Sequence, residues 1–494
     1  MTVSKSKTFR NIIYTGFGKG LTLICVALTS LVVARNLTSS DYGVVGFAAI
    51  IIGFLTQFSD LGVANAVIRR PNLHQHNLQT ALTLKIVLSI GAFGAALLVA
   101  PFARHFFDHP ATGNVIRILA LNFLVSTVGF LPQIVLTREM NYRALMIPGV
   151  AAAAAQCILA ITLVQLGWSY WAVIIANVGA TLTSGLAMQV IRKIPVRFRF
   201  DWPDAQEFLR FGIPLFGSGI LAFVIFNLDN FLVGASMGST RLGYYALAFT
   251  WGSFICGILT ATVNNVLFPA FSAIQHDLVA VRRWYLKTVD LVAFIAVVAN
   301  TALLANAHFF LVTLLGKGGN KWLPAVLALK ILCIYGILRA IAEPLSPCLM
   351  ACGRTKTLLH ATLLAGGVEL ALLVLALRSA RIELIACAVL IAYISQALVY
   401  LPFLRGNLDI TGKDLITQLW PMLPALAGGY LVTLLLPASF GETLITLVAR
   451  LLFTGSIVAL IHGFCTRFRC FQEASKMILQ NFPRGRFATE TVTS

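Results

Sequence analysis

Five charged residues inside long apolar stretches of the sequence are the best placed to do chemistry. They are Lys19, Asp229, Lys330, Arg339 and Glu369. A charge in an apolar segment that crosses a membrane is costly, so such residues usually face a cavity, a partner or a transport path. We expect the cationic groups to be candidates for binding an anion, and the carboxyls to be candidates for binding an ion or forming an ion pair.

Glu369 follows Gly366 and Gly367 and lies near the middle of the apolar stretch at 358–378. A carboxyl at that depth is neutral, paired with a cation, or in contact with a wet cavity. Two interpretations stay open, namely coupling to protons or Na⁺, and a structural ion pair with Lys330 or Arg339. Asp229 either bonds to a neighbouring helix or lines the outer half of a path.

Lys19 lies between Gly18 and Gly20, about a third of the way into the first apolar stretch. Small neighbours allow a backbone or ligand to approach closely. An ammonium group there suits a phosphate that enters from the cytoplasmic side, as a point charge. The alternatives are that Lys19 extends to the membrane surface or pairs with an acid.

Signatures of enzymatic chemistry are missing from the sequence. It contains no nucleophile elbow, paired catalytic carboxylates, metal-ligand cluster or nucleotide fingerprint. Cys348 and Cys352 have no His or further Cys to complete a zinc site. We therefore expect no enzyme, no catalytic residue, no metal and no cofactor.

The elements that must position these residues are membrane helices. Of the 494 residues, 58% are hydrophobic and 11% are charged, whereas soluble proteins carry about 25% charged residues. A helix of about 20 residues crosses a bilayer. We predict an all-α polytopic membrane protein with about 14 such helices. The predicted spans are 12–34, 43–66, 80–100, 114–136, 144–166, 168–190, 208–234, 242–266, 288–312, 322–346, 358–378, 383–404, 415–436 and 442–465.

The net charge of +19 does not indicate nucleic-acid binding, because the basic residues are scattered over short gaps between apolar stretches. Gaps on one predicted side carry more than three times as many Lys and Arg as gaps on the other. Basic loops face the cytoplasm. Both termini are therefore predicted to be cytoplasmic.

The sequence also repeats itself. FGKG at 17–20 precedes DYG at 41–43, and FGSG at 216–219 precedes LGYY at 242–245 at nearly the same spacing. Six predicted spans separate the copies, so equivalent helices run in the same direction. We predict two parallel six-helix bundles at 1–199 and 200–405, followed at 406–494 by two extra helices and a cytoplasmic tail.

Several motifs are similar to those of a known family. They are RNLTSSDYG at 35–43, FSDLGV at 58–63, AVIRR at 66–70, NLDNFLVG at 227–234 and LGYYA at 242–246. Their order resembles the polysaccharide transporter family, the flippase branch of the multidrug/oligosaccharidyl-lipid/polysaccharide exporter superfamily. The first predicted helix lacks the carboxylate of the sodium-coupled drug exporters, which puts any cation site taken from them in doubt.

The resemblance implies a bacterial inner-membrane protein that flips undecaprenyl-diphosphate-linked oligosaccharide repeat units for exopolysaccharide or O-antigen biosynthesis, by alternating access. A cavity holding Lys19, Lys330, Arg339 and Glu369 would suit the diphosphate, with membrane lipid around the tail. A polysaccharide polymerase and a co-polymerase are the expected protein partners. The alternatives are drug or metabolite efflux and, in a different class, a polysaccharide polymerase.

Overall fold

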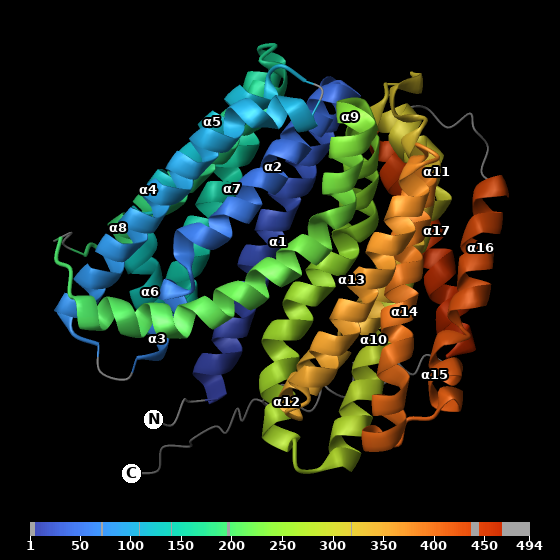
Figure 1. The fold of residues 1–494 in the computed structure, drawn as a ribbon. Helices are drawn as coiled ribbons and strands as arrows, with labels where there is room; N and C mark the ends of the chain where they lie inside the picture. Colours follow the sequence, from blue (N-terminus) through green and yellow to red (C-terminus); the bar gives the residue numbers. More distant parts are fainter. Residues whose placement is uncertain are drawn as a thin grey trace, which may run out of the picture. The chain divides into compact units, whose positions relative to one another are not determined.

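The structure is a computed structural model that describes residues 5–70, 73–107, 109–139, 141–194, 198–317, 319–435 and 444–466. Within these ranges every regular element is a helix, which confirms the all-α class (Figure 1). The predicted tail after Cys465 lies outside the described residues except for Thr466.

The chain folds into two compact units. The first comprises Met1–Thr250, His308–Ile331 and Gly366–Ala392, and the second comprises Trp251–Ala307, Leu332–Ala365 and Tyr393–Ser494. The predicted boundaries at 199/200 and 405/406 remain a prediction.

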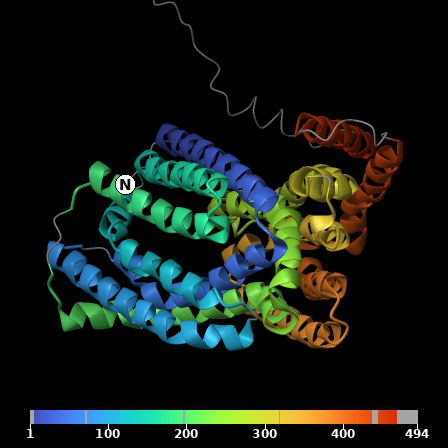
Figure 2. The same cartoon turned by 90° about the horizontal axis from the view of Figure 1, so that it is seen from above.

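The first unit is built mainly from the amino-terminal half of the chain. Its helices are α1 (Lys5–Asn36), α2 (Ser39–Asp60), α3 (Val63–Arg69), α4 (Gln75–Phe106), α5 (Thr112–Val125), α6 (Phe130–Arg138), α7 (Tyr142–Gln165), α8 (Ser169–Ile191), η1 (Phe309–Leu315) and η2 (Asn320–Trp322). Helix α7 packs on α1 and α8, and α4 packs on α2 and α5. Figure 2 shows α1 and α7, in blue and teal, next to each other.

The remaining helices belong to the second unit or are divided between the units. Those divided are α9 (Trp202–Ile274), α11 (Ala325–Ala342), α13 (Thr355–Leu377) and α14 (Ile382–Leu408). Those of the second unit are α10 (Leu278–Ala305), α12 (Leu345–Ala351), α15 (Gly412–Leu419), α16 (Met422–Leu435) and α17 (Leu444–Cys465). Helices α10, α16 and α17 pack on one another.

The described helices are those of a multi-pass membrane protein. Eleven are long and apolar enough to cross a membrane, or up to 12 if α5 and α6, which meet at a 52° bend, form one span. Large apolar side chains such as Leu98, Ile158 and Val190 are more than half exposed, which suits contact with lipid rather than water. The predicted number of about 14 spans is not confirmed.

Part of the difference in number comes from α9, which is counted once although it covers both predicted spans 208–234 and 242–266. Its backbone is interrupted at Gly238, with φ 83° and ψ 177°. Residues with side chains rarely adopt this conformation, whereas glycine does so readily. Gly238 therefore joins two helices without a loop between them.

The start of α2 shows how a repeated motif sets local structure. Thr38 Oγ1 accepts a hydrogen bond from the Asp41 backbone N–H at 3.1 Å, and the Asp41 carboxylate accepts one from the Thr38 backbone N–H at 3.4 Å. This reciprocal capping satisfies two N–H groups that the first helical turn leaves unpaired. The helix consequently begins at Ser39.

Equivalent positions of the predicted repeat meet within the first unit. A Cβ added to Gly43 would clash with the Ser239 carbonyl, and one added to Gly243 would clash with the Ser39 carbonyl. Hydroxyls of Ser40 and Ser239 lie 2.7 Å apart. Such reciprocal contacts are typical of two related elements around a twofold axis.

A buried tryptophan lies beside the same two segments. Trp322 of η2 has no exposed surface, and its ring meets the edges of Tyr42 and Tyr244 at 5.9 and 6.0 Å between centroids. Trp322 Nε1 and Lys321 Nζ each donate to the Ala34 carbonyl at 3.0 Å. Burial lowers the pKa of Lys321 to about 8. These contacts tie η2 to the end of α1.

Candidate functional site

Two carboxyl groups are buried close to each other in the first unit. Asp229 on α9 is 2% exposed and Glu369 on α13 is 8% exposed. Asp229 is the charged group that acts electrostatically on Glu369. Gly366, one turn before Glu369, allows α13 to approach α9, because a Cβ there would lie 3.1 Å from Ile225.

The Asp229 carboxylate is held in place by its own helix pair. Its Oδ2 accepts a hydrogen bond from the Tyr245 hydroxyl at 2.6 Å. Its Oδ1 accepts from the Asn230 backbone N–H at 2.7 Å and from Asn230 Nδ2 at 3.0 Å. Tyr245 and Asp229 lie on opposite sides of the break at Gly238, so this break brings the donor to the carboxylate.

Glu369 differs from Asp229 in its polar contacts. Within its own unit, no described Lys or Arg forms an ion pair with it, and no described residue forms a hydrogen bond with its side chain. A proton or a small cation between Glu369 and Asp229 would offset the repulsion of two carboxylates in a buried site. The arrangement therefore suits reversible binding of a proton or a monovalent cation.

The three predicted anion-binding residues are divided between the units. Lys19 on α1 and Lys330 on α11 lie in the first unit and are half-buried. In the described part of the chain the Lys19 ammonium forms no hydrogen bond or ion pair. Gly18 packs on Met146 of α7, and the space next to Gly20 is open.

Arg339 lies in the second unit, in an aromatic setting. Its Nη1 donates to the Tyr335 hydroxyl at 3.0 Å, and the Tyr393 hydroxyl donates to the Arg339 carbonyl at 3.4 Å. The Tyr335 and Tyr393 rings meet edge to face at 5.5 Å. These contacts place Arg339 against two tyrosine side chains.

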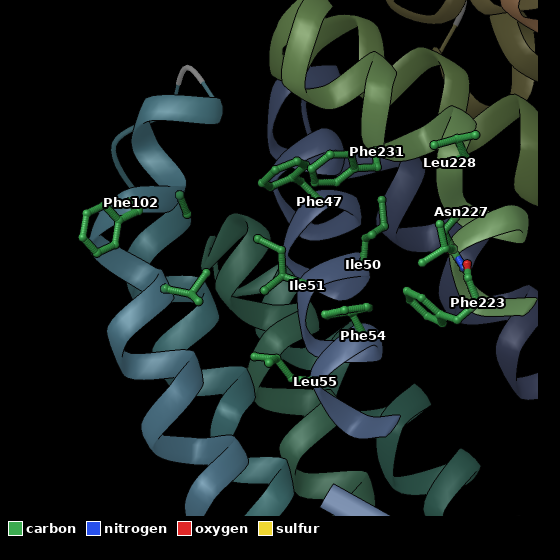
Figure 3. Close-up of a pocket in the computed structure, with 13 residues that line it drawn as sticks. Phe47, Ile50, Ile51, Phe54, Leu55, Phe102, Phe223, Asn227, Leu228 and Phe231 are labelled. Carbon is green, nitrogen blue, oxygen red and sulfur yellow. The ribbon is translucent and has the colours of Figure 1, made fainter. Parts of the chain in front are cut away.

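An apolar pocket of about 500 Å³ lies in the first unit between α2, α4 and α9 (Figure 3). Its walls are mainly phenylalanine and isoleucine side chains, and the Nδ2 of its polar member, Asn227, donates to the Phe223 carbonyl of its own helix. The pocket thus offers space for a hydrocarbon chain and little for polar groups. Its lining residues are Phe47, Ile50, Ile51, Phe54, Leu55, Val99, Phe102, Ala103, Phe223, Val224, Asn227, Leu228 and Phe231.

Sequence reasoning missed this pocket, since its phenylalanines come from helices far apart in the chain. It also did not single out Lys85. This residue is 6% exposed, and its Nζ donates to the Ser59 carbonyl at 2.9 Å and to Ser59 Oγ at 3.2 Å. Lys85 therefore joins α4 to the end of α2. The signal for it was a single lysine in an apolar stretch.

The fold is shared with solved transporters of lipid and drug substrates. The lipid II flippase MurJ, in an inward closed conformation, aligns with 92% of this chain and 98% of its own at a TM-score of 0.70 and 16% identity. An inward-facing multidrug resistance MATE family transporter of the MOP superfamily aligns with 76% of this chain and 93% of its own at a TM-score of 0.61 and 14% identity. The chain therefore has the MOP exporter fold.

The family follows from the sequence. The family described as "polysaccharide biosynthesis protein" matches residues 32–327, and the chain belongs to it. The lipopolysaccharide biosynthesis protein WzxC of Escherichia coli K12 is 25% identical over 65% of each chain. The teichuronic acid biosynthesis protein TuaB of Bacillus subtilis is 26% identical over 60% of this chain and 61% of its own. The matched part spans less than two thirds of these relatives' length. The resemblance inferred from the motifs is confirmed.

Proposed function

We propose that this protein flips lipid-linked oligosaccharide repeat units across a bacterial inner membrane for exopolysaccharide or O-antigen biosynthesis. The observation that carries the proposal is the combination of membership in a polysaccharide biosynthesis family with the fold of MurJ. The cargo is an undecaprenyl-diphosphate-linked saccharide, and the mechanism is alternating access without catalysis. Both termini face the cytoplasm, and a polysaccharide polymerase with its co-polymerase uses the exported units.

The cationic residues are proposed to bind the diphosphate. Lys19, Lys330 and Arg339 are basic groups on membrane helices, where a phosphate oxygen is a far better partner than lipid. The open space beside Gly20 supports this role for Lys19. The apolar pocket of Figure 3 is proposed to receive part of the polyprenyl tail while the saccharide crosses.

The carboxyl pair is proposed to couple the conformational cycle to an ion gradient. Protonation or cation binding at Glu369 and Asp229 removes a repulsion between α13 and α9 and so favours one arrangement of these helices over another. A ligand shifts a conformational equilibrium only through such a difference in affinity between two states.

The role of Lys19 can be tested by complementation. In a strain that lacks the gene, Lys19→Ala is expected to reduce surface glycan about tenfold or more, because a hydrogen bond to a charged group contributes about 1.5–3 kcal/mol. Lys193→Ala removes the same charge from an exposed position and serves as the control. Full complementation by a stably inserted Lys19→Ala protein would rule out the anion-binding role.

Efflux of a drug or metabolite is the second candidate, supported by the fold of the MATE transporter. It predicts normal glycan in the deletion strain and increased sensitivity to a toxic compound. The flippase proposal predicts loss of surface glycan in the deletion strain. Any increase in sensitivity to toxic compounds would then result only from the altered cell surface.

A further inference from the structure

A second cavity, of about 470 Å³, lies in the first unit where α3 meets the start of α9. It is lined by three arginines, Arg69, Arg70 and Arg210, by Glu207, and by the rings of Phe208 and Phe211. It shares no residue with the apolar pocket of Figure 3. None of the residues proposed to bind the diphosphate lies in it.

One wall of this cavity is fixed by buried hydrogen bonds. Arg70 Nη1 donates to Asp204 Oδ1 at 2.7 Å, and Asn77 Nδ2 donates to Asp204 Oδ2 at 2.6 Å. Asp204 is 6% exposed and Asn77 has no exposed surface. Arg138 donates to the Arg70 carbonyl. These bonds fix Arg70 and the wall that it forms.

The charges of the cavity leave two guanidinium groups available. Arg70 forms ion pairs with both Asp204 and Glu207, since its Nη1 also lies 3.4 Å from Glu207 Oε2. Arg69 stacks on the Phe211 ring at 4.8 Å. In the described part of the chain neither Arg69 nor Arg210 forms an ion pair. The lining carries three arginines and one acid, Glu207, so its net charge is +2, which suits the negative charge of a phosphate group.

The position of the cavity indicates a lipid as the source of that phosphate. Arg69 ends α3, in the short connection between the membrane helices α2 and α4, and α3 lies beside the start of α9 (Figure 1). Just before α9 continues into the cavity, Phe198, Phe200 and Trp202 are 73%, 50% and 63% exposed. Exposed aromatic side chains beside a membrane helix are typical of the membrane–water interface.

We propose that this cavity binds the phosphodiester headgroup of an anionic membrane phospholipid. Arg69 and Arg210 hold the phosphate oxygens, because a guanidinium group presents paired donors that match them. The Phe208 and Phe211 rings contact the adjoining apolar part of the lipid. Basic pockets between membrane helices bind anionic headgroups in this way. The site anchors α3 and the start of α9 to the membrane surface.

Native mass spectrometry of the purified full chain with phosphatidylglycerol tests the proposal. The wild type is expected to retain phosphatidylglycerol in preference to phosphatidylcholine. The double variant Arg69→Gln/Arg210→Gln is expected to bind it about thirtyfold more weakly, because each basic residue near an anionic lipid surface contributes a factor of about five to the affinity. Arg192→Gln, which removes a charge from the exposed ion pair with Glu139, is the matched control and should bind as the wild type does.

A variant with the opposite effect separates binding from folding. Glu207→Gln removes a negative charge from the cavity rim and is expected to tighten phosphatidylglycerol binding. Unchanged binding in both Arg69→Gln/Arg210→Gln and Glu207→Gln would overturn the proposal. So would equal retention of phosphatidylcholine, or displacement of the lipid by millimolar inorganic phosphate, which would show a site for free phosphate.

Discussion

Glu369 and Asp229 differ in what surrounds their carboxyl groups. Asp229 accepts hydrogen bonds from Tyr245 and Asn230, whereas Glu369 receives none from the described part of the chain. A buried polar group without a hydrogen-bond partner destabilises the folded protein. Such a group is therefore expected mainly where function requires it. We therefore propose that Glu369 carries the ion-binding step and that Asp229 has a fixed supporting role.

Replacing Glu369 tests this assignment. If Glu369 binds the coupling ion, export by the wild type slows when the proton or sodium gradient is collapsed. Glu369→Gln lowers the export rate at least tenfold and makes the residual rate insensitive to the gradient, since the amide cannot bind or release a proton. Surface glycan labelled in a short pulse, with and without an ionophore, measures both effects.

The control for this experiment is Glu383→Gln. Glu383 lies in the first turn of α14, and its Oε2 is 3.6 Å from Arg381 Nε. Its replacement therefore removes one carboxylate from the same unit without touching the buried pair. Gradient-dependent export by Glu369→Gln at the wild-type rate would contradict a coupling role.

Residue types in the sequence identified Asp229 and Glu369, but could not show that the two side chains are neighbours. They lie on α9 and α13, and their proximity depends on how these helices pack. The interpretation that pairs Glu369 with Lys330 or Arg339 rested on charge alone. Within the first unit Asp229 acts electrostatically on Glu369.

At the scale of elements, glycine positions decide how closely helices approach. The segments that begin at Ser39 and Ser239 contact each other through Gly43 and Gly243, and each glycine faces a backbone carbonyl of the other segment. No side chain fits into either contact. The two copies of the repeat therefore depend on these glycines for their packing.

Gly43→Ala is expected to lower the thermal unfolding midpoint of the detergent-purified protein by several degrees. Overpacking costs about 1–3 kcal/mol and outweighs the gain of at most about 1 kcal/mol from alanine in a helix. Gly46→Ala, on the same helix, is the control, because its Cβ would lie at an ordinary 3.7 Å from Ala246. A midpoint for Gly43→Ala equal to that of Gly46→Ala would show that the two segments do not pack this closely.

Hydropathy predicted where the chain is apolar enough to cross a membrane, and one of the places where its helices break. The break of α9 at Gly238 lies in the gap between the predicted spans 208–234 and 242–266. The predicted span 114–136, in contrast, is split into α5 and α6 by a 52° bend. A pattern of apolar residues does not contain information on that bend.

At the scale of the whole molecule, the family and the fold both support the proposal of a lipid-linked cargo. The repeat, the motif order and the composition indicated the family, because these patterns persist in relatives whose overall sequence identity is low. The apolar pocket and the arginine cavity could not be predicted, since both are formed by residues from helices distant in the chain. Both cavities suit parts of a lipid, one a hydrocarbon chain and the other a phosphate headgroup.

Flipping is measured most directly as the sidedness of lipid-linked saccharides in a strain lacking this gene. A permissive background avoids starvation for the lipid carrier, and a membrane-impermeant periodate probe reports on radiolabelled repeat units in spheroplasts. Complete repeat units are expected to accumulate on the cytoplasmic leaflet, protected from the probe, and the wild-type gene is expected to restore their exposure. Complete repeat units that react with the probe in the deletion strain would contradict the flippase proposal, because flipping would then proceed without this protein.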